Sequence, residues 1–155
     1  MAAAEKGESV AQFQLGLAYE KGSGVETNAA TAASWFRKAA VQGLAAAQFK
    51  LGVAHLKGEG VDREATEAVE WIRKAVEQGH AKAQSYLGMM YHQGMGVARD
   101  EAEGTKWYRK AAEAGLAEAQ SDLGLIHANG RGVPRDSAEA VRWFRKAAEI
   151  GRAHV

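Results

Sequence analysis

Hydrophobic and small residues recur at fixed spacings along this chain, and the whole pattern returns every 36 residues. In the first half of each block an Ala and a Leu stand four residues apart, as in Ala11 and Leu15, and Tyr or His follows four residues later, as in Tyr19. This spacing places the side chains on one face of a helix. A Gly-x-Gly-Val segment follows in every block, and Gly ends helices at low cost because it tolerates positive φ. The pattern predicts a helix and then a turn.

A second helix is predicted in the other half of each block. It begins near Asn28, Glu64, Asp100 and Asp136, and Asn or Asp in three of these positions suits a helix N-cap. The segment then carries Trp, an aromatic residue or Ile, and Arg-Lys-Ala, and it ends at the Gly that opens the next block. The repeating unit is therefore helix, turn, helix, and the fold class is all-α.

The blocks align without insertions or deletions over residues 7–42, 43–78, 79–114 and 115–150. A fixed period of this length is typical of a solenoid, in which each unit buries its apolar face against its neighbours. We therefore expect one α-solenoid domain over residues 1–155. One Gly recurs inside each first helix, where it costs about 1 kcal/mol relative to Ala. Close approach of a neighbouring helix, or of the Trp, would offset that cost; these glycines are Gly16, Gly52, Gly88 and Gly124.

Both ends of the chain resemble incomplete blocks. Residues 1–6 match the end of a second helix, and residues 151–155 match the start of a fifth block. Because solenoids usually carry polar capping units, we expect the chain to be a piece of a longer protein. The absence of a secretory signal at residues 1–6 then says nothing about that parent.

Composition narrows the function classes. A net charge of +1 disfavours general binding to nucleic acid, which needs a basic footprint. No apolar run approaches the roughly 20 residues of a membrane span, so we expect no membrane insertion. The chain has no Cys, which excludes disulfides and thiolate metal sites and is compatible with any compartment.

Candidate chemical motifs are better explained by the repeat. His55 and His127 share a block position but lie two blocks apart, about 20 Å if helices are spaced by 8–10 Å, so they cannot share a metal ion. Tyr occupies the same position in the other blocks, and we expect a packed, partly buried role for both His. The Gly-x-Gly segments lack the further Gly, Lys and Ser/Thr of phosphate loops, and no Gly-x-Ser-x-Gly elbow is present. We expect no cofactor, no metal and no catalysis.

The combined motifs closely resemble the Sel-1-like repeat (SLR) family, a relative of tetratricopeptide repeats. In the fourth block the motifs read Ala-Gln-Ser-Asp-Leu-Gly over 119–124, Gly-Arg-Gly-Val over 130–133, and Ala-Val-Arg-Trp-Phe-Arg-Lys-Ala-Ala-Glu-Ile-Gly over 140–151. The resemblance covers essentially the whole chain. It implies a right-handed superhelix of antiparallel helix pairs, with the first helices lining a concave groove, that serves as a scaffold for protein–protein interaction in signalling, secretion, quality control or bacterial host contact.

The resemblance also raises an enzymatic alternative, because β-lactam binding or hydrolysis is associated with some cysteine-rich SLR proteins. The nearest match to their Ser-x-x-Lys motif is Ser34-Trp-Phe-Arg37, where Arg replaces Lys and we expect the Trp to be buried. The Arg-Lys pairs of the second helices form a basic row. Because Glu follows three of these Arg by four residues, the spacing of intrahelical pairs, we expect a solvated, partly neutralised convex face.

Block positions on the first helix that change between copies are the candidates for recognition, since the core accounts for the constant ones. The third block stands out, because Tyr is enriched at binding hot spots and Met adapts to varied apolar partners. The candidate partner-binding residues are Gln14, Lys50, Lys82, Tyr86, Met89, Met90, Met95, Glu118 and Asp122. The leading hypothesis is a non-catalytic scaffold that binds a peptide or protein segment, and the alternative is a spacer within a larger repeat protein. The partner, the oligomeric state and the compartment stay open.

Overall fold

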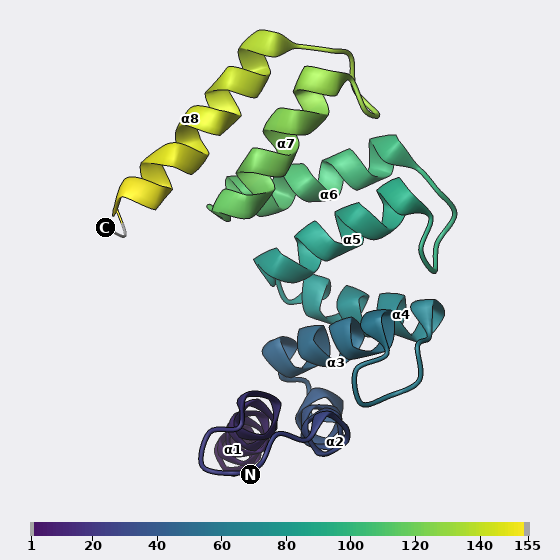
Figure 1. The fold of residues 1–155 in the computed structure, drawn as a ribbon, viewed down its shortest axis with the longest axis vertical. Helices are drawn as coiled ribbons and strands as arrows, with labels where there is room; N and C mark the ends of the chain where they lie inside the picture. Colours follow the sequence, from purple (N-terminus) through teal and green to yellow (C-terminus); the bar gives the residue numbers. More distant parts are fainter. Residues whose placement is uncertain (1, 154–155) are drawn as a thin grey trace. The chain divides into compact units, whose positions relative to one another are not determined.

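The computed structural model describes the backbone of residues 2–153 and the side chains of residues 7–152. These residues form eight helices and no strand, as predicted. Figure 1 shows the helices in chain order, with a long turn inside each repeat and a short one between repeats. Their bounds are α1 Ala2–Lys21, α2 Ala29–Val41, α3 Ala45–Lys57, α4 Ala65–Glu77, α5 Ala81–Gln93, α6 Glu101–Glu113, α7 Ala117–Asn129 and α8 Ser137–Ala153.

The predicted helix caps are confirmed. The side chains of Asn28, Asp100 and Asp136 each accept a hydrogen bond of 3.0 Å from the backbone N–H three residues later, whereas Glu64 makes no such bond. Both glycines of each Gly-x-Gly-Val segment have φ between 69° and 77°, a conformation that only Gly adopts readily. The second Gly also lets repeats approach, because a Cβ on Gly60 would collide with the backbone of Ala29. Gly is therefore required here for conformation and for space.

Among the five glycines that open a block, Gly7 and Gly151 lie inside helices, whereas the three between them follow helix ends. Gly43, Gly79 and Gly115 have positive φ and follow the ends of α2, α4 and α6. The expected helix end at Gly151 is wrong, because α8 continues to Ala153, and α1 likewise runs through Gly7 without a break. A Gly inside a helix costs only about 1 kcal/mol, so it ends a helix where packing of the next element favours the turn. Residues 154–155 of the predicted fifth block lie outside the described part.

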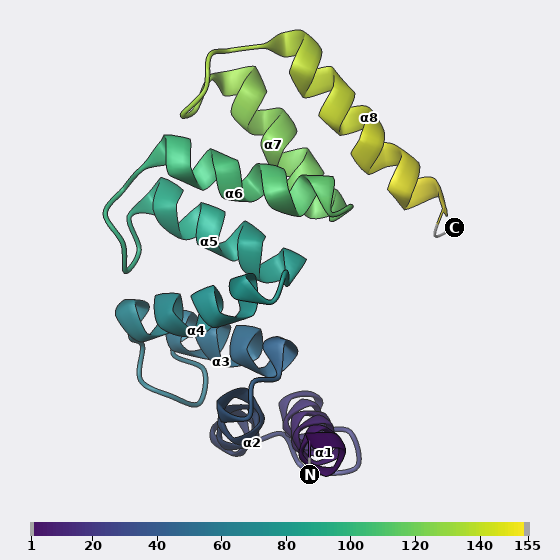
Figure 2. The ribbon, with the colours of Figure 1, turned by 180° about the vertical axis from the view of Figure 1, so that it is seen from behind.

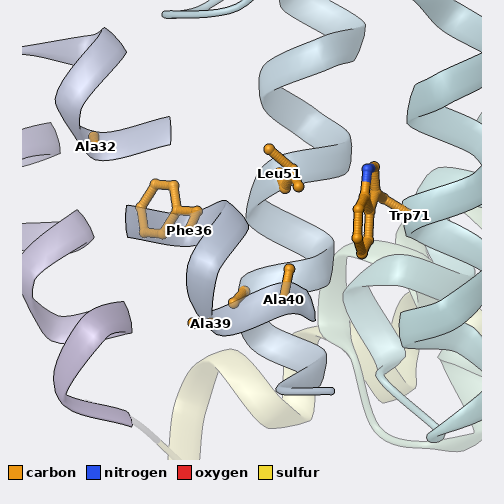
Figure 3. Close-up of a cluster of buried hydrophobic side chains, with 7 residues drawn as sticks. Ala32, Phe36, Ala39, Ala40, Leu51 and Trp71 are labelled. Carbon is orange, nitrogen blue, oxygen red and sulfur yellow. The ribbon is translucent and has the colours of Figure 1, made fainter. Parts of the chain in front are cut away.

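Contacts divide the chain into two compact units, residues 1–80 and 81–155, each with two repeats. In the first unit α1 packs on α2, α2 on α3 and α3 on α4. Its core gathers residues from α2, α3 and α4, including Phe36, Leu51 and Trp71 (Figure 3). Leu51 is 0% exposed. Leu51 of α3 thus packs against α2 of the preceding repeat, and the expected burial of the apolar face of the first helix against a neighbouring unit is confirmed for this helix.

The second unit repeats this arrangement. There α5 packs on α6, α6 on α7 and α7 on α8; Figure 2 shows the α5–α6 and α7–α8 pairs from behind. The Gly inside each first helix does allow close approach, but the neighbour is the residue after the Trp. A Cβ on Gly124 would stand 2.5 Å from the ring of Phe144, and one on Gly52 would stand 2.6 Å from Ile72. These glycines seat the second helix on the first within each repeat.

Candidate functional site

The Arg of the Arg-Lys pair lies between consecutive repeats. Arg37 donates a hydrogen bond of 2.9 Å to Nε2 of His55 in the next repeat, and it lies 3.8 Å from Glu67. Because Nε2 accepts this bond, Nδ1 carries the proton that His55 donates to the carbonyl of Asp62 at 3.2 Å. A wide depression of about 800 Å³ opens beside these side chains.

The second unit repeats the contacts of this Arg with His and Glu, but Nδ1 of His127 is buried without a hydrogen-bond partner. Arg109 donates to His127 at 3.0 Å and lies 4.0 Å from Glu139 of the next repeat. The expectation that this Arg pairs with Glu113 on its own helix is therefore wrong, since its ionic partner lies across the repeat interface. The buried role predicted for His55 and His127 is confirmed, because each is 7% exposed.

The Lys of each pair covers the Trp three residues before it. The four ammonium groups stand 4.1–4.5 Å from the ring centroids, a cation–π geometry. Trp71 and Trp143 are buried, but Trp35 in the Ser34-Trp-Phe-Arg37 segment is only partly buried, which corrects the expectation for it. Arg37 of that segment is directed to His55 and not to a serine nucleophile.

The candidate partner-binding residues differ in exposure. Gln14, Lys82 and Glu118 are exposed, and Lys50, Tyr86, Met89, Met95 and Asp122 are partly buried. Met90 is 0% exposed and belongs to the core, so its assignment to a binding surface was wrong. Met89 and Met90 are adjacent on a helix and therefore face different directions, which composition alone does not reveal.

In the first unit, Lys50 at a variable position forms an ion pair with Glu20 of the preceding repeat. The Lys50 ammonium lies 2.9 and 3.0 Å from the two carboxylate oxygens of Glu20. It also stands 6.0 Å from the ring centroid of Phe36. This contact joins α3 to α1 through an ion pair whose side chains are 31% and 35% exposed.

In the second unit, the equivalent positions border an open pocket. The pocket, of about 190 Å³, lies among the end of α5, the middle of α6, α7 and the turn after α7. We call it the α7 pocket; its lining residues are His92, Gln93, Tyr108, Asp122, Leu125, Ile126, Asn129 and Arg131. Of the candidate residues it contains Asp122, whereas Tyr86, Met89 and Met95 do not line it.

His92 is held at the rim of the α7 pocket by its neighbours. Its Nε2 lies 3.1 Å from the hydroxyl of Thr105, and its ring meets that of Tyr108 edge-on at 5.5 Å. A Cβ on Gly104 would collide with the imidazole, so the one glycine of α6 makes room for it. His92 is 5% exposed, and burial, with the nearby Arg131 charge second, lowers its pKa below the usual 6.5.

Burial also raises the pKa of the two acidic groups that line the α7 pocket, Asp122 and Tyr108. It raises the pKa of the Asp122 carboxyl, and Glu118 one turn earlier on α7 raises that pKa further. Burial and the Asp122 charge raise the pKa of Tyr108 to about 12, against an opposing effect of Arg131. The neutral forms of Tyr108 and His92 are thus favoured, and the pocket also contains the Asp122 carboxyl and the Arg131 guanidinium.

Sequence reasoning missed most of the α7 pocket. Tyr108 occupies a block position where the other copies have Phe36, Ile72 and Phe144, so its hydroxyl is unique at that position. The aligned blocks carry that difference, but it falls on the second helix, outside the first-helix positions that the repeat pattern predicts for recognition.

The described residues contain no group of three or more His, Asp or Glu placed to hold a metal ion. Within the same part of the chain, no helix has the length and apolar character needed to cross a membrane.

Comparison with known proteins identifies the repeat. The model of the Sel1 repeat matches residues 9–44, 45–80, 81–116 and 117–151, the predicted period shifted by two residues. No curated protein matches the chain. Among solved structures, a protective antigen present in uropathogenic Escherichia coli strains, which displays an SLR fold, is 42% identical over 96% of this chain and 32% of its own, with a TM-score of 0.88.

Other solved bacterial structures agree. A Sel1 repeat protein from Oxalobacter formigenes is 44% identical over 96% of this chain and 61% of its own, with a TM-score of 0.82. Cysteine rich protein B of Helicobacter pylori shares the fold at 19% identity, over 80% of this chain and 92% of its own, with a TM-score of 0.65. This chain thus spans about a third of the first structure and about three fifths of the second. It belongs to the Sel1 repeat family, whose members generally mediate protein–protein interactions and are generally non-catalytic.

Proposed function

We propose that the chain is a non-catalytic scaffold that binds a peptide or protein segment through the variable positions of its first helices, α1, α3, α5 and α7. One observation carries the proposal: on α3, α5 and α7 the Ala, Leu and Gly positions that are constant between repeats are buried, and positions that vary beside them reach the surface. On α7, Leu123 is 0% exposed, while Asp122 next to it lines a pocket and Leu125 is 52% exposed. The fold does not require the identity of these side chains, so they are available for recognition.

The chemistry of the variable positions suits a peptide. Tyr86 offers an aromatic ring with a polar end, the residue type most often found at interface hot spots. Leu125 adds exposed apolar surface, and Lys82, Glu118 and Asp122 add charges of both signs. Apolar anchors surrounded by charged groups are typical of interfaces that bind with selectivity.

The test is a selection of peptides from a random display library on the full chain, followed by affinity measurement. The double variant Tyr86→Ala with Lys50→Glu alters both units, and Lys106→Glu on the exposed face of α6 is the matched charge reversal outside the proposed surface. We expect selected peptides to bind the double variant at least about tenfold more weakly and to bind the control unchanged. Equal binding to all three proteins would contradict the assignment of the surface.

A spacer role within a longer protein is the second candidate. It is favoured by the coverage of only 32% and 61% of the two most identical structures described above. A spacer needs the core but no ligand. A selection that enriches no peptide, on a chain shown to be folded, would favour this alternative.

A further inference from the structure

The two units place different chemistry at the same block positions. Lys50 and Asp122 are equivalent, as are Glu20 and His92, and Phe36 and Tyr108. In the first unit Lys50 is neutralised by Glu20 at 2.9 Å above the Phe36 ring. In the second unit Asp122 stands in place of Lys50 and reverses the charge. His92 stands in place of Glu20, and burial favours its neutral imidazole. The ion pair that closes the first site cannot form in the second.

Asp122 has no cationic partner among the described residues. The Arg and His that line the same pocket are engaged elsewhere: Arg131 lies 3.5 Å from Glu101, and His92 is hydrogen-bonded to Thr105. The carboxylate is partly buried, and its pKa is raised by that burial and by Glu118 rather than lowered by any positive charge. A cation brought to this position would therefore relieve an electrostatic cost that the folded chain carries.

The walls of the α7 pocket fit the stem of a long side chain. Leu125 and Ile126 supply apolar surface on α7, the Tyr108 ring lies on the α6 side, and the Asn129 amide adds a hydrogen-bonding group. A space of about 190 Å³ accommodates one side chain rather than a folded segment. Lys and Arg bury their methylene stems along apolar surface while their charged ends seek a carboxylate.

We propose that the α7 pocket binds a lysine or arginine side chain of the partner, with the cation on Asp122 and the stem against Leu125. The inference rests on the proposed function, because it names the anchor residue of the peptide bound there. Arg131, which lines the same pocket, repels the same cation, and Arg99 shares Glu101 with Arg131. This repulsion favours a position of the cation at Asp122 and away from Arg131.

The experiment is a titration of the ¹⁵N-labelled full chain with n-butylguanidinium chloride, followed by NMR. The neutral isostere n-butylurea is the control ligand, and n-butylammonium distinguishes a lysine from an arginine preference. We expect saturable shifts of the Leu125, Ile126 and Asn129 amides with the cations and none with the urea. The equivalent amides of the first unit, at Val53, Ala54 and Lys57, serve as an internal control and should not move.

Two variants separate specific binding from general attraction to an acidic surface. Asp122→Asn should weaken n-butylguanidinium binding by about tenfold, the effect of losing one charge-assisted hydrogen bond. Glu113→Gln, which removes an exposed acid on α6, should leave it unchanged. Acidification of the wild type should abolish binding as Asp122 is protonated, so the proposal can be tested even if Asp122→Asn does not fold.

Equal shifts with n-butylurea, no shift with either cation, or binding unaffected by Asp122→Asn would overturn the inference. Each of these results would leave the proposed scaffold function standing if the library still yields peptides that bind the variable positions. Conversely, specific cation binding together with an unproductive library would support the pocket and contradict the scaffold. The two proposals therefore fail by different measurements.

Discussion

Substitution of one leucine in two repeats separates the contribution of repeat stacking from that of the helix itself. Leu15 and Leu51 occupy the same block position, on α1 and α3 of the first unit. Leu51 is 0% exposed because α2 of the preceding repeat packs on α3, together with Phe36 and Trp71 in one cluster. Leu15 is 42% exposed, since no described helix precedes α1. The same substitution, Leu→Ala, therefore removes a stacking contact at Leu51 and no such contact at Leu15.

The expected costs follow from burial. Removing a fully buried leucine costs about 2–5 kcal/mol, from lost transfer free energy and the cavity that remains. At Leu15 solvent reaches the site and no closed cavity forms, so about 1 kcal/mol is expected from the buried part of the side chain. We therefore predict that Leu51→Ala lowers the free energy of unfolding by about 2 kcal/mol more than Leu15→Ala does.

Urea denaturation followed by circular dichroism measures both variants against the wild type. The denaturant slopes should be unchanged, which would show that the stability and not the unfolding mechanism has changed. Equal costs for the two variants would contradict this prediction, because they would mean that stacking of α2 on α3 adds little to the stability that Leu51 contributes.

Three further predictions concern the second unit. Ala114→Gln should stabilise the chain by about 0.5–1.5 kcal/mol in urea denaturation, because Gln84 Oε1 is buried without a hydrogen-bond partner. In the first unit, the Gln side chains equivalent to position 114 donate to the corresponding oxygens of Gln12 and Gln48 at 2.7 and 2.9 Å. An unchanged denaturation midpoint would contradict this prediction. Because the pKa of Asp122 is raised, the folded chain binds this proton more readily than the unfolded chain does. The stability of the wild type relative to Asp122→Asn should therefore rise as pH falls through the folded pKa and level off below 3.8. The same pH dependence of stability in both proteins would contradict this prediction. Because the pKa of His92 is lowered in the folded chain, its contribution to stability should be present above pH 6.5 and lost as pH falls through the folded pKa. An NMR titration of the imidazole that gives a pKa of 6.5 or more would contradict the effect of burial.

Local features of the sequence predicted most of the fold. The caps at Asn28, Asp100 and Asp136 and the paired glycines act within one turn of chain, so spacing alone locates them. The ends of the chain were predicted less well. Helix α8 passes through Gly151 because a Gly stops a helix only where the following element packs against it, and that packing is not a local property.

The candidate site was harder to predict because it depends on contacts between repeats. Aligned blocks correctly separated variable from constant positions, yet they did not distinguish Met90 in the core from Met89 beside it. They also gave no sign that Lys50 meets Glu20 thirty residues earlier, or that Asp122 lacks such a partner. Which charges form ion pairs depends on the distances between side chains of different helices, and these distances cannot be deduced from a single sequence.

Recognition through the variable positions of the first helices can be measured by mapping amide chemical-shift changes on the full chain when a library-selected peptide binds. We expect the shifted amides to gather at the variable positions of α1, α3, α5 and α7, with Asp122 and Leu125 among them. Shifts confined to the outer faces of α2, α4, α6 and α8 would contradict it.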